Sequence, residues 1–111
     1  MRIMKALCLY DVPNKFTGIV EWGDGDVSYL KNGNLHREDG PSLIKINGFK
    51  EWNLDGKCIW FSAKKLDLTN KIILSKTQHP DYPLVQVWKV LDKNEIYDQI
   101  IIPGMEEHIR E

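Results

Sequence analysis

The sequence is poor in the features that mark several classes of protein. It has only two cysteines in 111 residues, Cys8 and Cys58, too few for a disulfide scaffold, so we expect two small buried hydrophobic side chains in a reducing compartment. No apolar run approaches the length of about 20 residues that a membrane-spanning helix needs, and the first ten residues lack a signal-peptide pattern. We therefore expect a cytoplasmic protein with no membrane segment.

Neither sign of charge dominates. The 15 basic and 16 acidic residues give a net charge of −1, whereas domains held to nucleic acid by charge usually carry a basic excess. The charges are unevenly spread, because residues 56–76 contain five lysines and one aspartate, and residues 77–111 contain three basic and seven acidic residues. Such runs are usually solvated faces, although a basic middle and an acidic tail can also steer a partner.

The short motifs of common active sites are missing as well. There is no glycine-rich phosphate loop, no serine nucleophile elbow and no HExxH zinc motif. Asp24-Gly25-Asp26 lacks the further oxygen ligands of a calcium loop, so we interpret it as a turn. His79 and His108 have no partner at ligand spacing. We expect no cofactor and no metal site.

Turn residues are abundant, and they divide residues 17–61 into short β-prone runs. Three dipeptides, Asn32-Gly33, Asn47-Gly48 and Asp55-Gly56, predict type I′ hairpin turns, because an Asx-Gly pair best tolerates positive φ at both central residues. The fold class expected is mainly β, with stacked antiparallel hairpins, a β-rich C-terminal cap and at most a short terminal helix.

The remaining chain supplies fewer signals. Residues 2–9, 71–75 and 95–102 predict strands, and residues 62–70 form a polar connection. Residues 84–92 leave helix and strand open, because a helical apolar stripe competes with β-branched and aromatic content. We prefer a strand that pairs with residues 95–102.

An internal repeat appears when the sequence is shifted by 23 residues. Turn residues then meet turn residues, and Tyr29 falls on Trp52. The two copies span residues 17–39 and 40–61, and each hairpin is expected to bury one face on its neighbour. We expect one domain over residues 1–111, with the repeat region at about 17–61 and the cap at about 62–111.

The first copy resembles a MORN-like repeat of bacteriophage, giant-virus and bacterial proteins. That unit runs roughly W-x-x-(N/D)-G-x-x-H-R-x-D-G-P-A. The second copy departs from it after Asp55-Gly56, because Ile59-Trp60 stand where His-Arg is expected. The resemblance implies a stack of β-hairpins of viral or bacterial origin, and little about activity. The matching residues are Tyr29, Asn32, Gly33, His36, Arg37, Asp39, Gly40, Pro41, Asp55 and Gly56.

The polar run His36–Asp39 of this motif invites a catalytic interpretation. One histidine beside carboxylates is too few for a metal site, which needs three or four convergent ligands. A structural role fits better, because an aspartate before Gly-Pro forms a turn and Arg37 can stack on an aromatic ring of the next hairpin. We expect these residues to be structural.

We thus expect a small non-enzymatic interaction module, in which a phage-encoded protein binds and modulates a host protein. The alternative is a nucleic-acid-binding protein that uses residues 56–76, since basic and aromatic side chains together suit single strands. A small enzyme centred on His36 and Asp39 is a third hypothesis. A homodimer is compatible with the open sheet edges of a hairpin stack. The candidate binding residues are Trp52, Lys57, Trp60, Phe61, Lys64 and Lys65.

Overall fold

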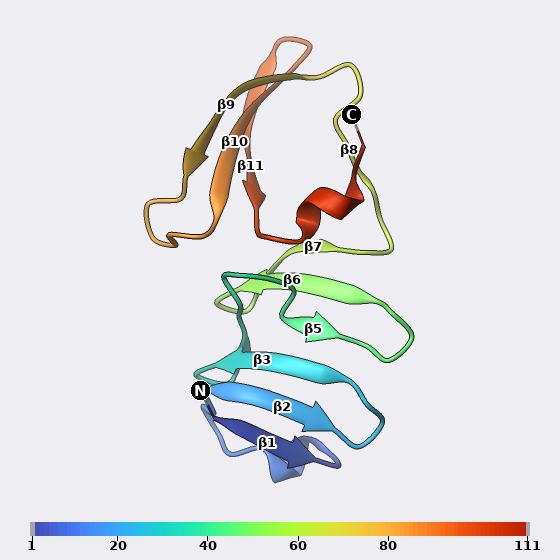
Figure 1. Cartoon of the computed structure of the whole chain (residues 1–111). Coiled ribbons are helices and arrows are strands. Elements are labelled where there is room, and N and C mark those ends of the chain that lie inside the picture. Colours follow the sequence, from blue (N-terminus) through green and yellow to red (C-terminus); the bar gives the residue numbers. More distant parts are fainter. Residues whose placement is uncertain (1, 111) are drawn as a thin grey trace. The chain divides into compact units, whose positions relative to one another are not determined.

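The computed structural model, which describes residues 2–110, is mainly β and contains only two short 3₁₀ helices (Figure 1). The chain divides into two compact units. The first comprises the residues up to Arg37 and Pro41–Ala63, and the second comprises Glu38–Gly40 and the residues from Lys64 onward. This boundary lies beside the expected division at residues 61–62, and the single domain remains a prediction. No helix among the described residues has the length and apolarity to cross a membrane.

The first unit is built on one seven-stranded sheet with the order β1-β2-β3-β5-β6-β7, in which β4 also pairs with β3. Its pairs are antiparallel except for β1 and β2, which run parallel. The mainly antiparallel, β-rich fold expected from the turns is therefore confirmed. The strands are β1 (Ile3–Ala6), β2 (Gly18–Trp22), β3 (Val27–Lys31), β4 (Asn34–Leu35), β5 (Leu43–Ile44), β6 (Lys50–Leu54) and β7 (Lys57–Phe61).

Two of the three predicted type I′ turns are present. Asn32-Gly33 has φ values of 51° and 82°, and Asp55-Gly56 has 48° and 82°. The prediction at Asn47-Gly48 is wrong. A type I′ turn needs a positive φ at both residues, and here only Gly48 has one, of 94°. The hairpin closes between Lys45 and Phe49, which leaves three loop residues instead of two. A three-residue loop takes a type I turn followed by a left-handed glycine.

The turns at residues 22–26 and 45–49 make the same hydrogen bonds. The N–H of Gly25 donates to the carbonyl of Trp22 at 3.0 Å, and the N–H of Gly48 donates to Lys45 at 2.9 Å. An Asx side chain, Asp24 or Asn47, accepts the N–H two residues later in each turn. The strands that follow, β3 and β6, are of equal length, and Tyr29 and Trp52 hold their third positions. The 23-residue spacing read from the sequence is thus also the spacing of these bonds.

The second unit contains an antiparallel sheet with the order β11-β10-β9 and a separate parallel pair of short strands. Of the ambiguous residues 84–92, residues 86–92 form a strand, and the predicted pairing with the strand that starts at Glu95 is correct. The polar connection at residues 62–70 was expected to be irregular but contains a short strand, whose Leu66 is buried. The elements are β8 (Leu66–Asp67), β9 (Ile72–Gln78), β10 (Gln86–Asp92), β11 (Glu95–Ile101), the 3₁₀ helix η2 (Met105–His108) and β12 (Ile109–Arg110).

One core cluster of the first unit lies where the N-terminal segment meets the sheet. Ala6, Phe16 and Val20 are buried together, and Trp22 and Leu30 are among the half-buried side chains that pack against them. The predicted first strand, residues 2–9, stops at Ala6. The 3₁₀ helix η1 (Leu9–Asp11) follows and leads the chain back toward β2.

Gly18 and Gly48 provide a matched test of this packing. A Cβ at Gly18 would collide with the carbonyl oxygen of Arg2 and touch the ring of Phe16, whereas a Cβ at Gly48 meets nothing within 4 Å. We expect Gly18→Ala to lower the free energy of unfolding by about 3 kcal/mol, and Gly48→Ala by about 1 kcal/mol from its backbone conformation alone. Urea denaturation measures both, and equal losses would contradict the close approach of β1 to β2.

Candidate functional site

The histidine of the repeat motif joins two hairpins. His36 is 8% exposed, and its Nδ1 accepts the backbone N–H of Asp55 at 2.8 Å. The N–H of His36 donates to the carbonyl of Tyr29 at 2.9 Å. Nδ1 also lies 3.4 Å from the Asp55 carboxylate, but an Nδ1 that accepts an N–H carries no proton to donate there. His36 therefore links the β6–β7 turn, through its imidazole, to β3, through its backbone.

Arg37 stacks on an aromatic ring of β3, a strand that precedes it in the chain. Its guanidinium lies 4.0 Å from the centroid of the Tyr29 ring, and Nη1 donates to the carbonyl of Pro41 at 3.1 Å. The N–H of Arg37 donates to the carbonyl of Asn53 on β6 at 3.1 Å. Tyr29 is thus one ring partner of Arg37, and the expected stack on a ring of the next hairpin stays a prediction.

Asp39 is exposed and belongs to the second compact unit, whereas His36 is buried in the first. One ring nitrogen of His36 is occupied by a backbone hydrogen bond, which leaves less capacity for acid–base chemistry at that side chain. Among residues 2–110, no group of three or more histidine, cysteine, aspartate or glutamate side chains is placed to hold a metal ion.

The six candidate binding residues differ in exposure and belong to both units. Trp52 is only 1% exposed, so its expected role in binding is wrong; β6 pairs on both sides, and the indole is a core side chain. Lys57 and Phe61 are exposed on β7, where the Phe61 ring lies 6.4 Å from that of the half-buried Trp60. Lys64 and Lys65 are exposed but belong to the second unit.

The expected burial of the two cysteines is also wrong, because both thiols are exposed. Cys8 lies outside the core, just before η1, and Cys58 lies on β7 at the end of the sheet order. Partial desolvation, helped by the negative charge of Glu51, raises the pKa of the Cys58 thiol above its usual value. The thiolate of Cys58 is therefore disfavoured at neutral pH.

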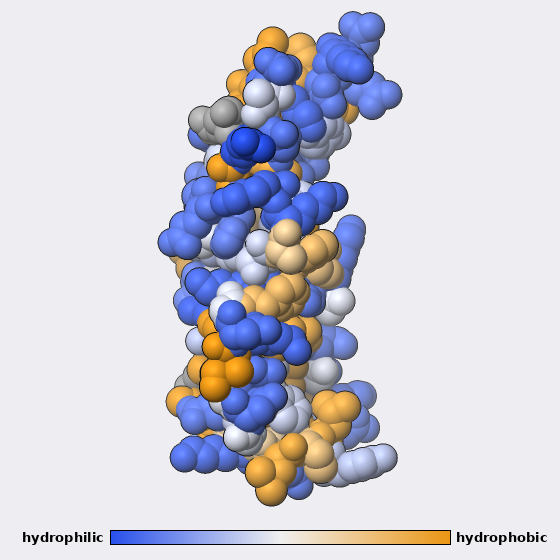
Figure 2. Space-filling model, turned by 90° about the vertical axis from the view of Figure 1, so that its right-hand side faces the viewer, coloured by the Kyte–Doolittle hydropathy of each residue, from blue (hydrophilic) through white to orange (hydrophobic). Residues whose placement is uncertain are grey.

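The most prominent surface feature was not predicted, and it lies at the turn that follows β1. Leu7, Leu9 and Tyr10 are 86%, 77% and 98% exposed, and we call them the N-terminal apolar patch. Figure 2 shows apolar atoms at the surface over the β1 end of the first unit. Three large side chains exposed within four residues are unusual for a surface with no partner, because contiguous apolar area is normally covered.

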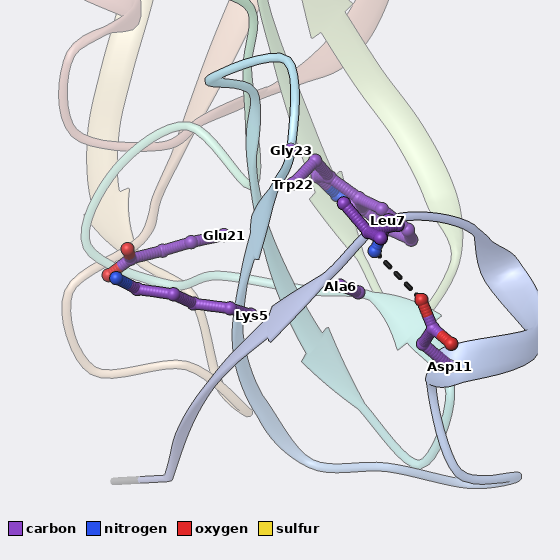
Figure 3. Close-up of a pocket in the computed structure, with 7 residues that line it drawn as sticks. All are labelled: Lys5, Ala6, Leu7, Asp11, Glu21, Trp22 and Gly23. Carbon is purple, nitrogen blue, oxygen red and sulfur yellow. Dashed lines mark hydrogen bonds between the residues drawn. The ribbon is translucent and has the colours of Figure 1, made fainter.

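The half-buried indole of Trp22 lies at the centre of the hollows beside this patch. One hollow, of about 540 Å³, lies between the end of β1 and the end of β2 (Figure 3). Two more hollows share Leu9, Trp22 and Ser28. The Trp22 Nε1–H donates to Ser28 Oγ at 2.9 Å, which fixes the ring. The residues that line the first hollow are Lys5, Ala6, Leu7, Asp11, Glu21, Trp22 and Gly23.

The carboxylate of Asp11 stabilises the turn that carries the N-terminal apolar patch. Asp11 Oδ2 accepts the backbone N–H of Leu7 at 2.8 Å (Figure 3) and that of Cys8 at 3.2 Å. These two bonds lower the pKa of the Asp11 carboxyl below its usual value, so the group is ionised at neutral pH. Asp11 satisfies the backbone N–H groups of Leu7 and Cys8 within the turn, and the apolar side chains of the turn face solvent.

No protein-family model, curated protein or solved structure matches this chain. The MORN-like resemblance therefore stays a prediction. The patch itself had a signal in the sequence, the apolar run Ala6–Tyr10 ahead of Asp11 and Pro13. The strand predicted over residues 2–9 includes Leu7 and Leu9, so it gave no sign that these side chains are exposed.

The structural role of His36 predicts a loss of stability on substitution. His36→Ala removes the acceptor for the Asp55 N–H and leaves a void, so we expect the free energy of unfolding to fall by about 1–3 kcal/mol. His36→Asn, whose Oδ1 can replace Nδ1 as an acceptor, should recover part of this loss. Urea denaturation distinguishes the three proteins, and an unchanged midpoint for His36→Ala would rule out the link.

The Asp11 turn predicts a pH dependence. Because the pKa of Asp11 is lower in the folded chain than in the unfolded chain, its stabilising effect is complete above the usual pKa and is lost as the pH falls through the folded pKa. We expect the amide proton shifts of Leu7 and Cys8 to titrate together in that acidic range. In Asp11→Asn this titration should be absent while the amides of β10 are unchanged.

Proposed function

We propose that this chain is a small non-enzymatic protein-interaction module, with the N-terminal apolar patch as its docking surface. The observation that carries the proposal is the near-complete exposure of Leu7, Leu9 and Tyr10. An exposed apolar patch with a polar rim is the usual mark of a protein–protein contact. An aromatic anchor at its centre contributes most where it enters a pocket of the partner, and Tyr10 is placed to do so.

The scaffold beneath the patch suits this role. The patch sits on a turn held by Asp11, and the turn is fastened to the sheet through Ala6, Phe16 and Val20. A loop that carries recognition residues binds with less loss of entropy when a rigid framework orders it beforehand. Trp22 adds apolar surface at the base of the patch, with its N–H already satisfied by Ser28.

The origin and setting of the module are part of the same proposal. A phage-encoded protein that binds and modulates a host protein in the host cytoplasm agrees with the motif Asn32–Pro41. The stacked-repeat interpretation is supported by the shared turn bonds 23 residues apart and by the bonds of His36 and Arg37. The nucleic-acid alternative rests only on the basic and aromatic composition of residues 56–76.

Capture experiments with matched variants test the proposal. The full chain, immobilised and exposed to bacterial lysate, should retain a partner at near-stoichiometric yield. Leu9→Ser combined with Tyr10→Ser should reduce this yield at least tenfold, because the variant removes most of the apolar contact.

Ile72→Ser combined with Ile96→Ser is the control, because it removes two side chains that are each 58% exposed on the second unit. This variant should retain the partner fully. Equal capture by the patch variant, or no specific partner for the unaltered chain, would overturn the proposed function.

A further inference from the structure

The sheet of the first unit ends at β1, whose backbone has one open edge among the described residues. The parallel register with β2 decides which groups face that edge. The carbonyls of Arg2 and Ala6 accept the N–H groups of Ile19 and Gly23 at 2.8 and 2.9 Å. Even-numbered residues of β1 therefore bond to β2, and the N–H and C=O groups of Ile3 and Lys5 point away from the sheet.

The open edge has a defined length. Leu7 would be the next residue to present its N–H outward, but that N–H donates to Asp11 Oδ2 at 2.8 Å. The edge thus offers two donors and two acceptors, those of Ile3 and Lys5, and then ends. An edge of this kind is a template for another strand unless something covers it.

We propose that β1 accepts an extended segment of a partner protein as an added antiparallel strand, with an acidic residue opposite Lys5. The proposal rests on the proposed function and names the way in which the partner is held. The Ile3 and Lys5 side chains lie on one face of the strand and are both exposed, Ile3 by 61%. In antiparallel pairing, residues directly opposite share a face, so the segment reads acidic-x-apolar from its N-terminus, with the apolar residue opposite Ile3.

The charge near β1 favours an acidic segment of a partner over a second copy of this strand. Between Arg2 and Tyr10 the chain carries two basic residues and no acid. Glu21 lies directly across from Lys5 on β2, and Figure 3 shows the two side chains alongside each other. An acid on the other side of Lys5 continues an alternation of charges across the sheet, which stabilises neighbouring strands. A second copy of β1 would instead bring Arg2 and Lys5 of both chains to one edge with no acid between them.

The N-terminal apolar patch is continuous with this edge. Leu7 follows Ala6, the last residue of β1, directly, so a segment that pairs with Ile3 and Lys5 and continues past them comes to Leu7. Main-chain bonds then supply a sequence-tolerant part of the affinity, and the side-chain contacts supply selectivity. The edge and the patch form one docking surface with two separable parts.

A synthetic peptide tests the edge directly. The probe is a ten-residue peptide with the central sequence Glu-Thr-Ile-Thr, added to the isotope-labelled full chain. We expect the amide protons of Ile3 and Lys5 to shift downfield and to exchange more slowly with solvent. The amide of Met4, which already bonds toward β2, should change little.

Charge reversal supplies the second readout. Lys5→Glu should weaken binding of the peptide about two- to fivefold, and a peptide with Lys in place of Glu should recover that loss. Lys93→Glu is the matched control, because it makes the same change at an exposed lysine of the second unit, and it should leave the affinity unchanged.

Each other outcome overturns the proposal. Shifts confined to Leu7, Leu9 and Tyr10 would show docking on the patch without strand addition, and the proposed function would survive. Equal losses for the two lysine variants would show attraction by net charge alone, and no shift at millimolar peptide would exclude the edge. Shifts of Ile3 and Lys5 that depend on protein concentration without peptide would assign the edge to a second copy.

Discussion

The sheet of the first unit depends on one edge of β3, which pairs with both β4 and β5. The N–H of Tyr29 donates to Ser42 at 2.7 Å, and its carbonyl accepts the N–H of His36 at 2.9 Å. The chain therefore leaves the sheet at His36 and re-enters it at Ser42 beside the same strand. This detour lets consecutive hairpins join one continuous ladder, and it explains why the excursion needs a Gly-Pro corner. The hydrogen bond from Arg37 Nη1 to the carbonyl of Pro41 holds the two ends of the detour together.

Most of the strand pattern could be predicted because it depends on local chemistry. Two Asx-Gly pairs have the left-handed φ values that only such pairs take easily, and the strands between them followed from the turns. Asn47-Gly48 has the same letters but a different turn, because the length of its loop is set by the pairing of Lys45 with Phe49. The parallel pairing of β1 with β2 had no local signal, since it joins segments separated by the whole η1 region.

The candidate site was less predictable than the fold. Trp52, Lys57, Trp60 and the lysines that follow are close in the sequence, so they look like one basic and aromatic stretch. Pairing in the sheet buries Trp52, and no residue of this stretch signals that burial locally. Exposure of a run such as Leu7–Tyr10 depends on where a strand stops, and one carboxylate, that of Asp11, decides this. No periodicity marks such an event.

The parallel attachment of β1 also has a consequence for how the molecule opens. The hairpin of β2 and β3 closes within a few residues, whereas β1 must bring together positions 16 apart, such as Ile3 and Ile19, to pair at all. Because β1 pairs on one side only and no tight turn joins it to β2, it is the strand of this sheet most readily released. Its release uncovers Val20 and Phe16 while the hairpins stay folded. The N-terminal strand thus covers part of the hydrophobic core of the first unit, and its detachment exposes both apolar side chains and the free edge of β2, two features that favour aggregation.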